Sequence, residues 1–139
     1  MERNNASGGT ALYYYEKDYI MRLIHGVAQI LAKLLFNRQE EVEIPAVMEE
    51  YCRKDDDLLK RMVDEGRVNE AEEKLFDLLA SASWDDKQKA ALALSFYDYL
   101  NGKDDEFLAA ADFSREEIIR GLEDAMKAVG MEIPEYLRL

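Results

Sequence analysis

The sequence is poor in the residues that build metal centres and covalent cross-links. Its 139 residues include one cysteine, Cys52, and one histidine, His25. A zinc site needs several Cys or His ligands, and a ferritin-like di-iron bundle needs a Glu-x-x-His pair from each of two helices. One histidine and one cysteine cannot supply either set. A lone cysteine cannot form an internal disulfide, which is typical of a cytoplasmic protein.

Helix-breaking residues are also scarce. The chain has two prolines and seven glycines; three of the glycines lie in or before the first predicted helix, and the other four are expected where helices stop. No stretch shows the strict alternation of apolar and polar residues that marks a strand. We therefore predict one all-α domain of about six to seven helices in antiparallel hairpins, either tetratricopeptide-like or an irregular bundle.

Basic residues are outnumbered, with 18 Lys and Arg against 30 Asp and Glu and a net charge of −12. Such a field repels phosphate backbones, so we expect no nucleic-acid partner. It also opposes adsorption to anionic membranes. The start, MERNNASGGT, is polar and unlike a secretory signal, which again favours the cytoplasm. We expect residues 1–12 to be a disordered tail and residues 13–139 to form the domain.

Apolar periodicity and capping residues predict where the helices lie. The predicted helices cover residues 17–36, 46–65 with a break near residue 55, 70–81, 84–101, 104–111 and 115–129, followed by a turn at 135–139. The expected N-terminal caps are Asp18, Asn69 with Glu72, Ser83, and Ser114 with Glu117. In the helix at 84–101, residues 90–97 are apolar and alanine-rich nearly all round, which would let a neighbouring helix come close.

The first predicted helix is apolar over about two-thirds of its circumference, and its polar residues form a narrow ridge. This predicts that it is either the central helix of the bundle or a helix that also serves a partner. A high density of aromatic residues, including Tyr97, suits an interface as well as a core. The candidate interaction residues are Ile20, Arg22, Ile24, His25, Val27, Leu31, Lys33 and Tyr97; Gln29 completes the ridge.

Motifs that carry chemistry are absent from the sequence. No nucleophile or carboxylate lies beside His25 at local spacing, and the cations adjacent to Cys52 point away from it on a helix. The acidic runs at 55–57 and 104–106 lack the alternating ligands and central glycine of an EF-hand loop. There is no glycine-rich phosphate loop. We therefore predict no catalytic, cofactor-binding or metal-binding residues and a protein that is not an enzyme.

Residues 64–79, DEGRVNEAEEKLFDLL, resemble the turn and second helix of a tetratricopeptide repeat. In that family a glycine ends the first helix and an early alanine of the second packs against it. Gly66 and Ala71 match these two positions. The resemblance implies a helical hairpin, and more remotely a peptide-binding groove.

From Tyr15 onward the chain also resembles a family of bacterial all-helical proteins with no assigned function. The matching segments are YEKDYIMR at residues 15–22, LAKLLF at 31–36, DEFL at 105–108 and FSREEI at 113–118. This resemblance implies that the domain starts near residue 14.

These features favour a non-enzymatic interaction or scaffolding module that binds a protein segment or itself, with self-association through the first helix as one form. One alternative is a peripheral membrane protein that uses residues 17–36 as a basic amphipathic anchor. Another alternative is a small-molecule or metal-dependent enzyme.

Overall fold

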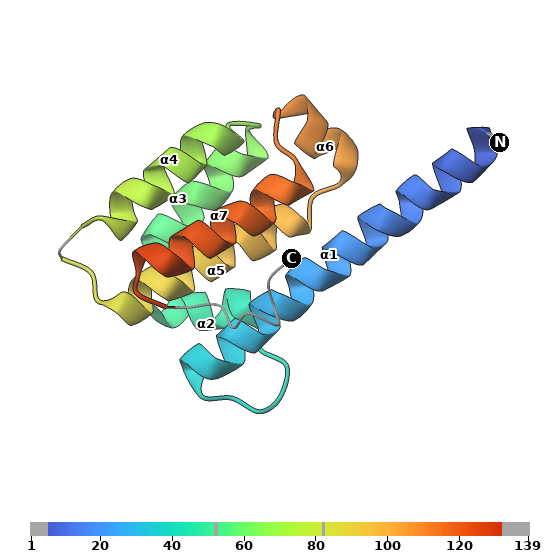
Figure 1. Cartoon of the computed structure of the whole chain (residues 1–139). Coiled ribbons are helices and arrows are strands. Elements are labelled where there is room, and N and C mark those ends of the chain that lie inside the picture. The colour runs from blue at the N-terminus through green and yellow to red at the C-terminus, as the bar shows by residue number, and fades with distance from the viewer. Residues whose placement is uncertain (1–5, 52, 82, 132–139) are drawn as a thin grey trace.

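The computed structural model describes residues 6–51, 53–81 and 83–131, and in these residues every regular element is an α-helix. This confirms the predicted all-α class. The helices are α1 (Ala6–Phe36), α2 (Ile44–Tyr51), α3 (Arg53–Asp64), α4 (Val68–Leu79), α5 (Asp86–Asn101), α6 (Asp105–Ala110) and α7 (Arg115–Ala128) (Figure 1).

Helix α5 is the centre of the molecule. It packs against α1, α2, α3, α4 and α7, and residues 90–97 along its middle are all buried. The small side chains of Ala90, Ala91 and Ala93 leave room for neighbours on several sides, as the composition predicted. The first helix is therefore not the central one. Helix α1 packs only against α5 and α7 among its principal contacts, and covers one side of the bundle.

Helices α3 and α4 form the hairpin that the tetratricopeptide resemblance implied. Gly66 ends α3 with a positive φ of 82°, a conformation that glycine adopts without steric cost. Its backbone N–H donates to the carbonyl of Val63, and the next N–H, of Arg67, donates to that of Met62. Ala71, in the first turn of α4, is fully buried.

Polar contacts fix α3 against the central helix. The Ser95 hydroxyl donates to Asp56 Oδ1 at 2.6 Å, and Lys60 Nζ lies 2.9 Å from Asp56 Oδ2. One turn further along, the Tyr99 hydroxyl donates to Asp64 Oδ1 at 2.6 Å. The acidic run at 55–57 thus contributes one buried structural carboxylate.

Three of the four predicted helix caps are wrong, those at Asn69 and Ser83 and, as described below, the one at Asp18. Asp85, not Ser83, caps α5: Asp85 Oδ1 accepts from the Gln88 N–H at 2.8 Å and Gln88 Oε1 accepts from the Asp85 N–H at 3.2 Å. Ser83 instead shares a hydrogen bond with the hydroxyl of Ser81. Asn69 lies inside α4 and donates to the carbonyls of residues 111 and 112, which joins α4 to the end of α6.

Other predicted ends are confirmed. Ser114 and Glu117 form a reciprocal capping box at the start of α7, and Asp104 caps α6. The predicted break near residue 55 is found slightly earlier, between α2 and α3. Gly121 departs from the prediction for the later glycines because it lies within α7. Cys52 and the predicted turn at 135–139 lie outside the described residues.

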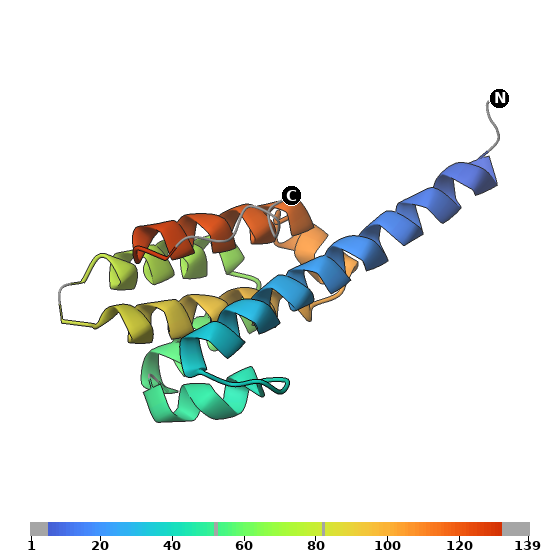
Figure 2. The same ribbon diagram turned by 60° about the horizontal axis from the view of Figure 1, so that its bottom comes forward.

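Helix α1 begins at Ala6, well before the predicted start at residue 17, so Asp18 lies inside it and does not cap it. Residues 6–12, which the sequence assigned to a disordered tail, are helical. The second half of α1 lies across α5 and α7, while its first half extends away from the body (Figures 1 and 2). Within the described residues, α1 is therefore covered by the rest of the fold along only part of its length.

Within the described residues, the stretch Asp18–Phe36 is long and apolar enough to cross a membrane by length and composition. Core helices of water-soluble domains pass the same test, and 39% of this stretch is buried inside the fold. Its polar residues at every turn argue against a bilayer span.

Candidate functional site

The side of α1 that faces away from the bundle is apolar. Among the residues whose side chains the structure describes, the exposed large apolar residues are Tyr19, with 57% of its surface exposed, and Leu34, with 65%. Leu23 and Ile30 are half-buried, and Leu23, at the margin of this side, also packs against the core. With Gly26 between them, these residues follow one another at spacings of three and four, which places them on one side of a helix. We call this set, Tyr19, Leu23, Gly26, Ile30 and Leu34, the outward face of α1.

Gly26 makes a gap in the middle of the outward face. A Cβ atom built at this position meets no atom within 4 Å. Glycine inside a helix costs about 1 kcal/mol relative to alanine, and here no contact within the chain requires it. The position between Leu23 and Ile30 is therefore open space that no described residue fills.

Three of the predicted interaction residues belong to the core. Ile24 and Leu31 are 1% exposed and Val27 is 9% exposed, on the side of α1 that packs against the bundle. Burial removes them from any partner, so assigning them to an interaction surface is wrong. The sequence pattern does not separate the two apolar sides of α1, because the residues on both sides are hydrophobic.

The residues of the polar ridge of α1 make different contacts. Gln29 is buried and pairs with the backbone of Val42: its Nε2 donates to the carbonyl at 2.9 Å, and its Oε1 accepts from the N–H at 2.8 Å. This two-bond contact fixes the connection at 37–43 against α1. The carbonyl of Lys33 adds a bond from the Arg38 N–H at 2.9 Å.

His25 lies beside two carboxylates that come from other elements. Its Nε2 is 3.1 Å from Glu41 Oε1 in the connection, and its Nδ1 is 3.9 Å from Asp98 Oδ1 on α5. Burial raises the pKa of Asp98, and the opposite charges of His25 and Lys60 partly offset that rise. No serine, cysteine or threonine is hydrogen-bonded to His25 in the contacts described. The arrangement ties the connection to α1.

Arg22 and Lys33 are the two basic residues of the polar ridge that form no ion pair within the described fold. Arg22 is exposed and Lys33 half-exposed, and both lie on one edge of the outward face. In the part of the chain that the structure describes, neither has an ion-pair partner. Ile20, on the opposite edge, is half-buried and lines a cavity of about 410 Å³ with residues of α6 and α7.

The buried cation of that cavity is already paired within the chain. Arg115 is buried there, donating to the carbonyls of Asn101 at 2.8 Å and Lys103 at 2.6 Å and lying 3.3 Å from Asp105. A second cavity, of about 570 Å³, lies along the connection at 37–43 and the start of α2. Its lining residues are mostly exposed.

Tyr97 is a core residue and not a surface for a partner. It is 1% exposed, and its hydroxyl donates to Glu72 Oε2 at 2.6 Å. Gly121 makes the arrangement possible, since a Cβ there would lie 2.6 Å from Glu72 Oε2 and from Tyr97 Cε1. Close packing of α7 over this pair explains why a glycine occurs inside α7.

The same cluster holds the half-buried acid Glu72. Burial raises the pKa of Glu72, the nearby charges of Glu117 and Asp124 raise it further, and the hydrogen bond from Tyr97 acts in the opposite sense. Burial and the bond to Glu72 raise the pKa of Tyr97 as well. Perturbed acids gather at functional sites, but buried polar contacts in a core produce the same effect.

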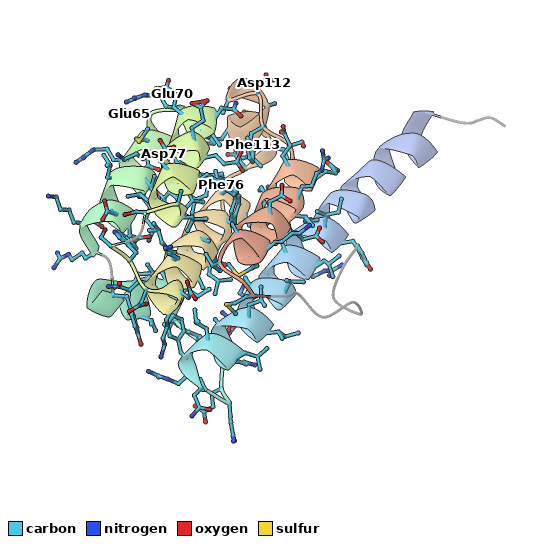
Figure 3. The ribbon with its side chains drawn as sticks, turned by 60° about the vertical axis from the view of Figure 1, so that its left-hand side comes forward. Glu65, Glu70, Phe76, Asp77, Asp112 and Phe113 are labelled. Atoms are coloured by element: carbon cyan, nitrogen blue, oxygen red, sulfur yellow. The ribbon has the colours of Figure 1, made fainter. Side chains whose placement is uncertain are left out.

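The described residues contain no group of three or more His, Cys, Asp or Glu side chains arranged to hold a metal ion. Exposed acids instead line the side of the molecule formed by α3 and α4. Glu65, Glu70 and Asp77 lie there, away from α1 (Figure 3). These three acids therefore lie far from the outward face, whereas Glu41 lies beside α1 at His25.

Comparison with known proteins places this geometry in a family. Residues 14–130 match DUF6483, a family of unknown function, and the chain belongs to it. The match begins where the sequence resemblance placed the start of the domain. Neither a curated protein nor a solved structure matches the chain.

Proposed function

We propose that the protein is a non-enzymatic protein-interaction module and that the outward face of α1 is its docking surface. The observation that carries this proposal is the exposure of Tyr19 and Leu34 on the same side of a helix that extends beyond the body. Both side chains keep apolar surface in water, which burial against a partner would remove. Each Å² of apolar surface removed from water contributes about 25 cal/mol.

The surroundings of the face fit a protein better than a membrane. A basic amphipathic anchor needs several cations along its apolar side, and here the described cations at the edge are Arg22 and Lys33. The net charge of −12 opposes approach to anionic lipid. Flotation with vesicles of phosphatidylserine and phosphatidylcholine tests this choice: co-flotation that is lost in Leu34→Glu would overturn the protein proposal.

An enzymatic role has less support because the polar clusters are engaged in structural contacts. Asp56 holds Ser95 and Lys60, and Glu72 holds Tyr97. His25 holds the connection at 37–43 against α1 through Glu41, and none of its described contacts is with a nucleophile.

The proposal is tested by comparing three immobilised proteins: wild type, Leu34→Glu and Ala80→Glu. Ala80→Glu introduces the same charge at an exposed position at the end of α4, which packs against α3, α5 and α7. We expect a protein that wild type and Ala80→Glu retain from native lysate and that Leu34→Glu loses. Binding of that protein is then measured with purified components. Identical retention by all three variants, together with a monomeric wild type, would refute the proposal.

A further inference from the structure

We propose that the occupant of the outward face is a second copy of this chain, packed antiparallel with the two α1 helices crossing at Gly26. The inference rests on the docking surface proposed above and adds the identity of the partner, the orientation and the point of crossing.

The distribution of charge favours contact between copies at this face. Two chains of charge −12 repel each other wherever their carboxylates meet. The outward face contains no acid, and its described charged neighbours on α1 are Asp18, Arg22 and Lys33. Glu65, Glu70 and Asp77 lie on the far side (Figure 3). In a dimer joined by α1 they are separated by both α1 helices, well beyond the screening length of about 8 Å at physiological salt.

Gly26 determines where the helices cross. Packed helices lie about 8–10 Å apart, and the shorter distances need small residues at the contact. Gly26 is at the centre of the outward face, with open space where a side chain would be. When two antiparallel helices cross there, Gly26 meets Gly26, and Leu23 and Ile30 of each copy lie near Ile30 and Leu23 of the other. The contact is isologous, so it closes as a two-fold dimer.

The charges at the edge select the antiparallel orientation. A crossing at Gly26 brings residue 18 of one copy level with residue 34 of the other, so Asp18 lies beside Lys33 of the second copy. Symmetry repeats this pair. In a parallel arrangement Asp18 would be level with Asp18 and Lys33 with Lys33. Asp18 is exposed and Lys33 half-exposed, so both are available for the contact.

The length of the contact indicates a modest affinity. Residues 18–34 span about 25 Å at 1.5 Å per residue. A single pair of helices over this length is below the size of a standard stable interface, so we expect a micromolar dissociation constant.

The test is sedimentation equilibrium of the purified chain across a concentration series, with thermal unfolding of each variant to verify folding. We expect a reversible monomer–dimer equilibrium for wild type. Leu34→Glu and Gly26→Gln should each weaken the dimer by about tenfold or more, the first by placing acids in the contact and the second by preventing close approach. Gly26→Gln should fold at least as stably as wild type, because its side chain enters open space. Ala80→Glu should leave the dimer unchanged.

Charge reversal tests the orientation. Asp18→Lys alone and Lys33→Glu alone should each weaken the dimer by roughly threefold to thirtyfold, since each disrupts two symmetric pairs. The double variant Asp18→Lys/Lys33→Glu should recover wild-type affinity. Absence of recovery, or a dimer insensitive to Gly26→Gln, overturns the antiparallel crossing.

Different results would refute the docking surface and the self-association. A wild-type chain that stays monomeric while retaining a lysate protein in a Leu34-dependent way overturns self-association and supports the docking surface. A dimer that survives Leu34→Glu places the contact elsewhere and overturns the inference.

Discussion

Replacing Gly121 by alanine is the sharpest test of how the core is packed. Gly→Ala inside a helix normally stabilises a protein by up to about 1 kcal/mol. At residue 121 the added methyl group would lie 2.6 Å from Tyr97 Cε1 and from Glu72 Oε2, where ordinary contacts are about 3.5–4.0 Å. Tyr97 is 1% exposed, so its ring cannot swing into solvent. Either α7 moves off α5 or the bond from Tyr97 to Glu72 is lost.

Overpacking of this kind costs about 1–3 kcal/mol, and a hydrogen bond to a charged group contributes about 1.5–3 kcal/mol. After subtracting the helix-propensity gain of about 1 kcal/mol, we expect Gly121→Ala to destabilise the protein by up to about 2 kcal/mol. For a chain of this size the melting temperature should fall by about 3–5 °C for each kcal/mol. Urea unfolding followed by circular dichroism, at a concentration low enough to keep the chain monomeric, measures the free energy directly.

Gly26→Ala is the matched control, because it makes the same substitution in open space. It should stabilise the monomer by up to about 1 kcal/mol. Adding Tyr97→Phe to Gly121→Ala should relieve part of the clash, so the two substitutions should not be additive. If Gly121→Ala is as stabilising as Gly26→Ala, the described packing of α7 on Tyr97 is wrong.

Two further predictions concern the pH profile and the helix caps. The folded-state pKa of Glu72 is raised, so its contribution to stability is complete below its unfolded pKa near 4.5 and is lost as pH rises through the folded pKa. Glu72→Gln should therefore gain stability relative to wild type as pH increases above about 4.5, in urea titrations at several pH values. Asp64→Asn should show the opposite trend, because Lys103 and Tyr99 lower the pKa of Asp64 and its contribution is lost as pH falls; equal trends in the two variants would contradict both assignments. Asp85→Ala should cost about 1 kcal/mol, whereas Ser83→Ala should stay within about 0.5 kcal/mol. A larger loss of stability in Ser83→Ala than in Asp85→Ala would show that Ser83, and not Asp85, caps α5.

The local features of the sequence located most of the elements. Scarcity of proline, the apolar periodicity and the box formed by Ser114 and Glu117 are short-range signals, and the structure places helices where they indicate. The caps of α4 and α5 were misassigned for a long-range reason in one case and a local one in the other. Asn69 bonds to the distant end of α6, while Asp85 competes successfully with Ser83 two residues away.

What the sequence determined by itself is the class of fold, the family and the helix with excess apolar surface. One histidine and one cysteine also excluded the common metal centres before any coordinates were known. These conclusions depend on residue counts and on periodicity along one helix, which the chain carries without reference to its neighbours.

Only the tertiary structure decided which side of α1 is free. Ile24 and Leu31 became core and Leu34 stayed exposed because α5 and α7 cover one side of the helix, and hydrophobicity alone does not record which side is covered. The structure likewise buried Tyr97 under Gly121 and brought Glu41 and Asp98 to His25 from outside its helix. Each of these contacts joins residues far apart in the chain, and its geometry follows from how the helices pack.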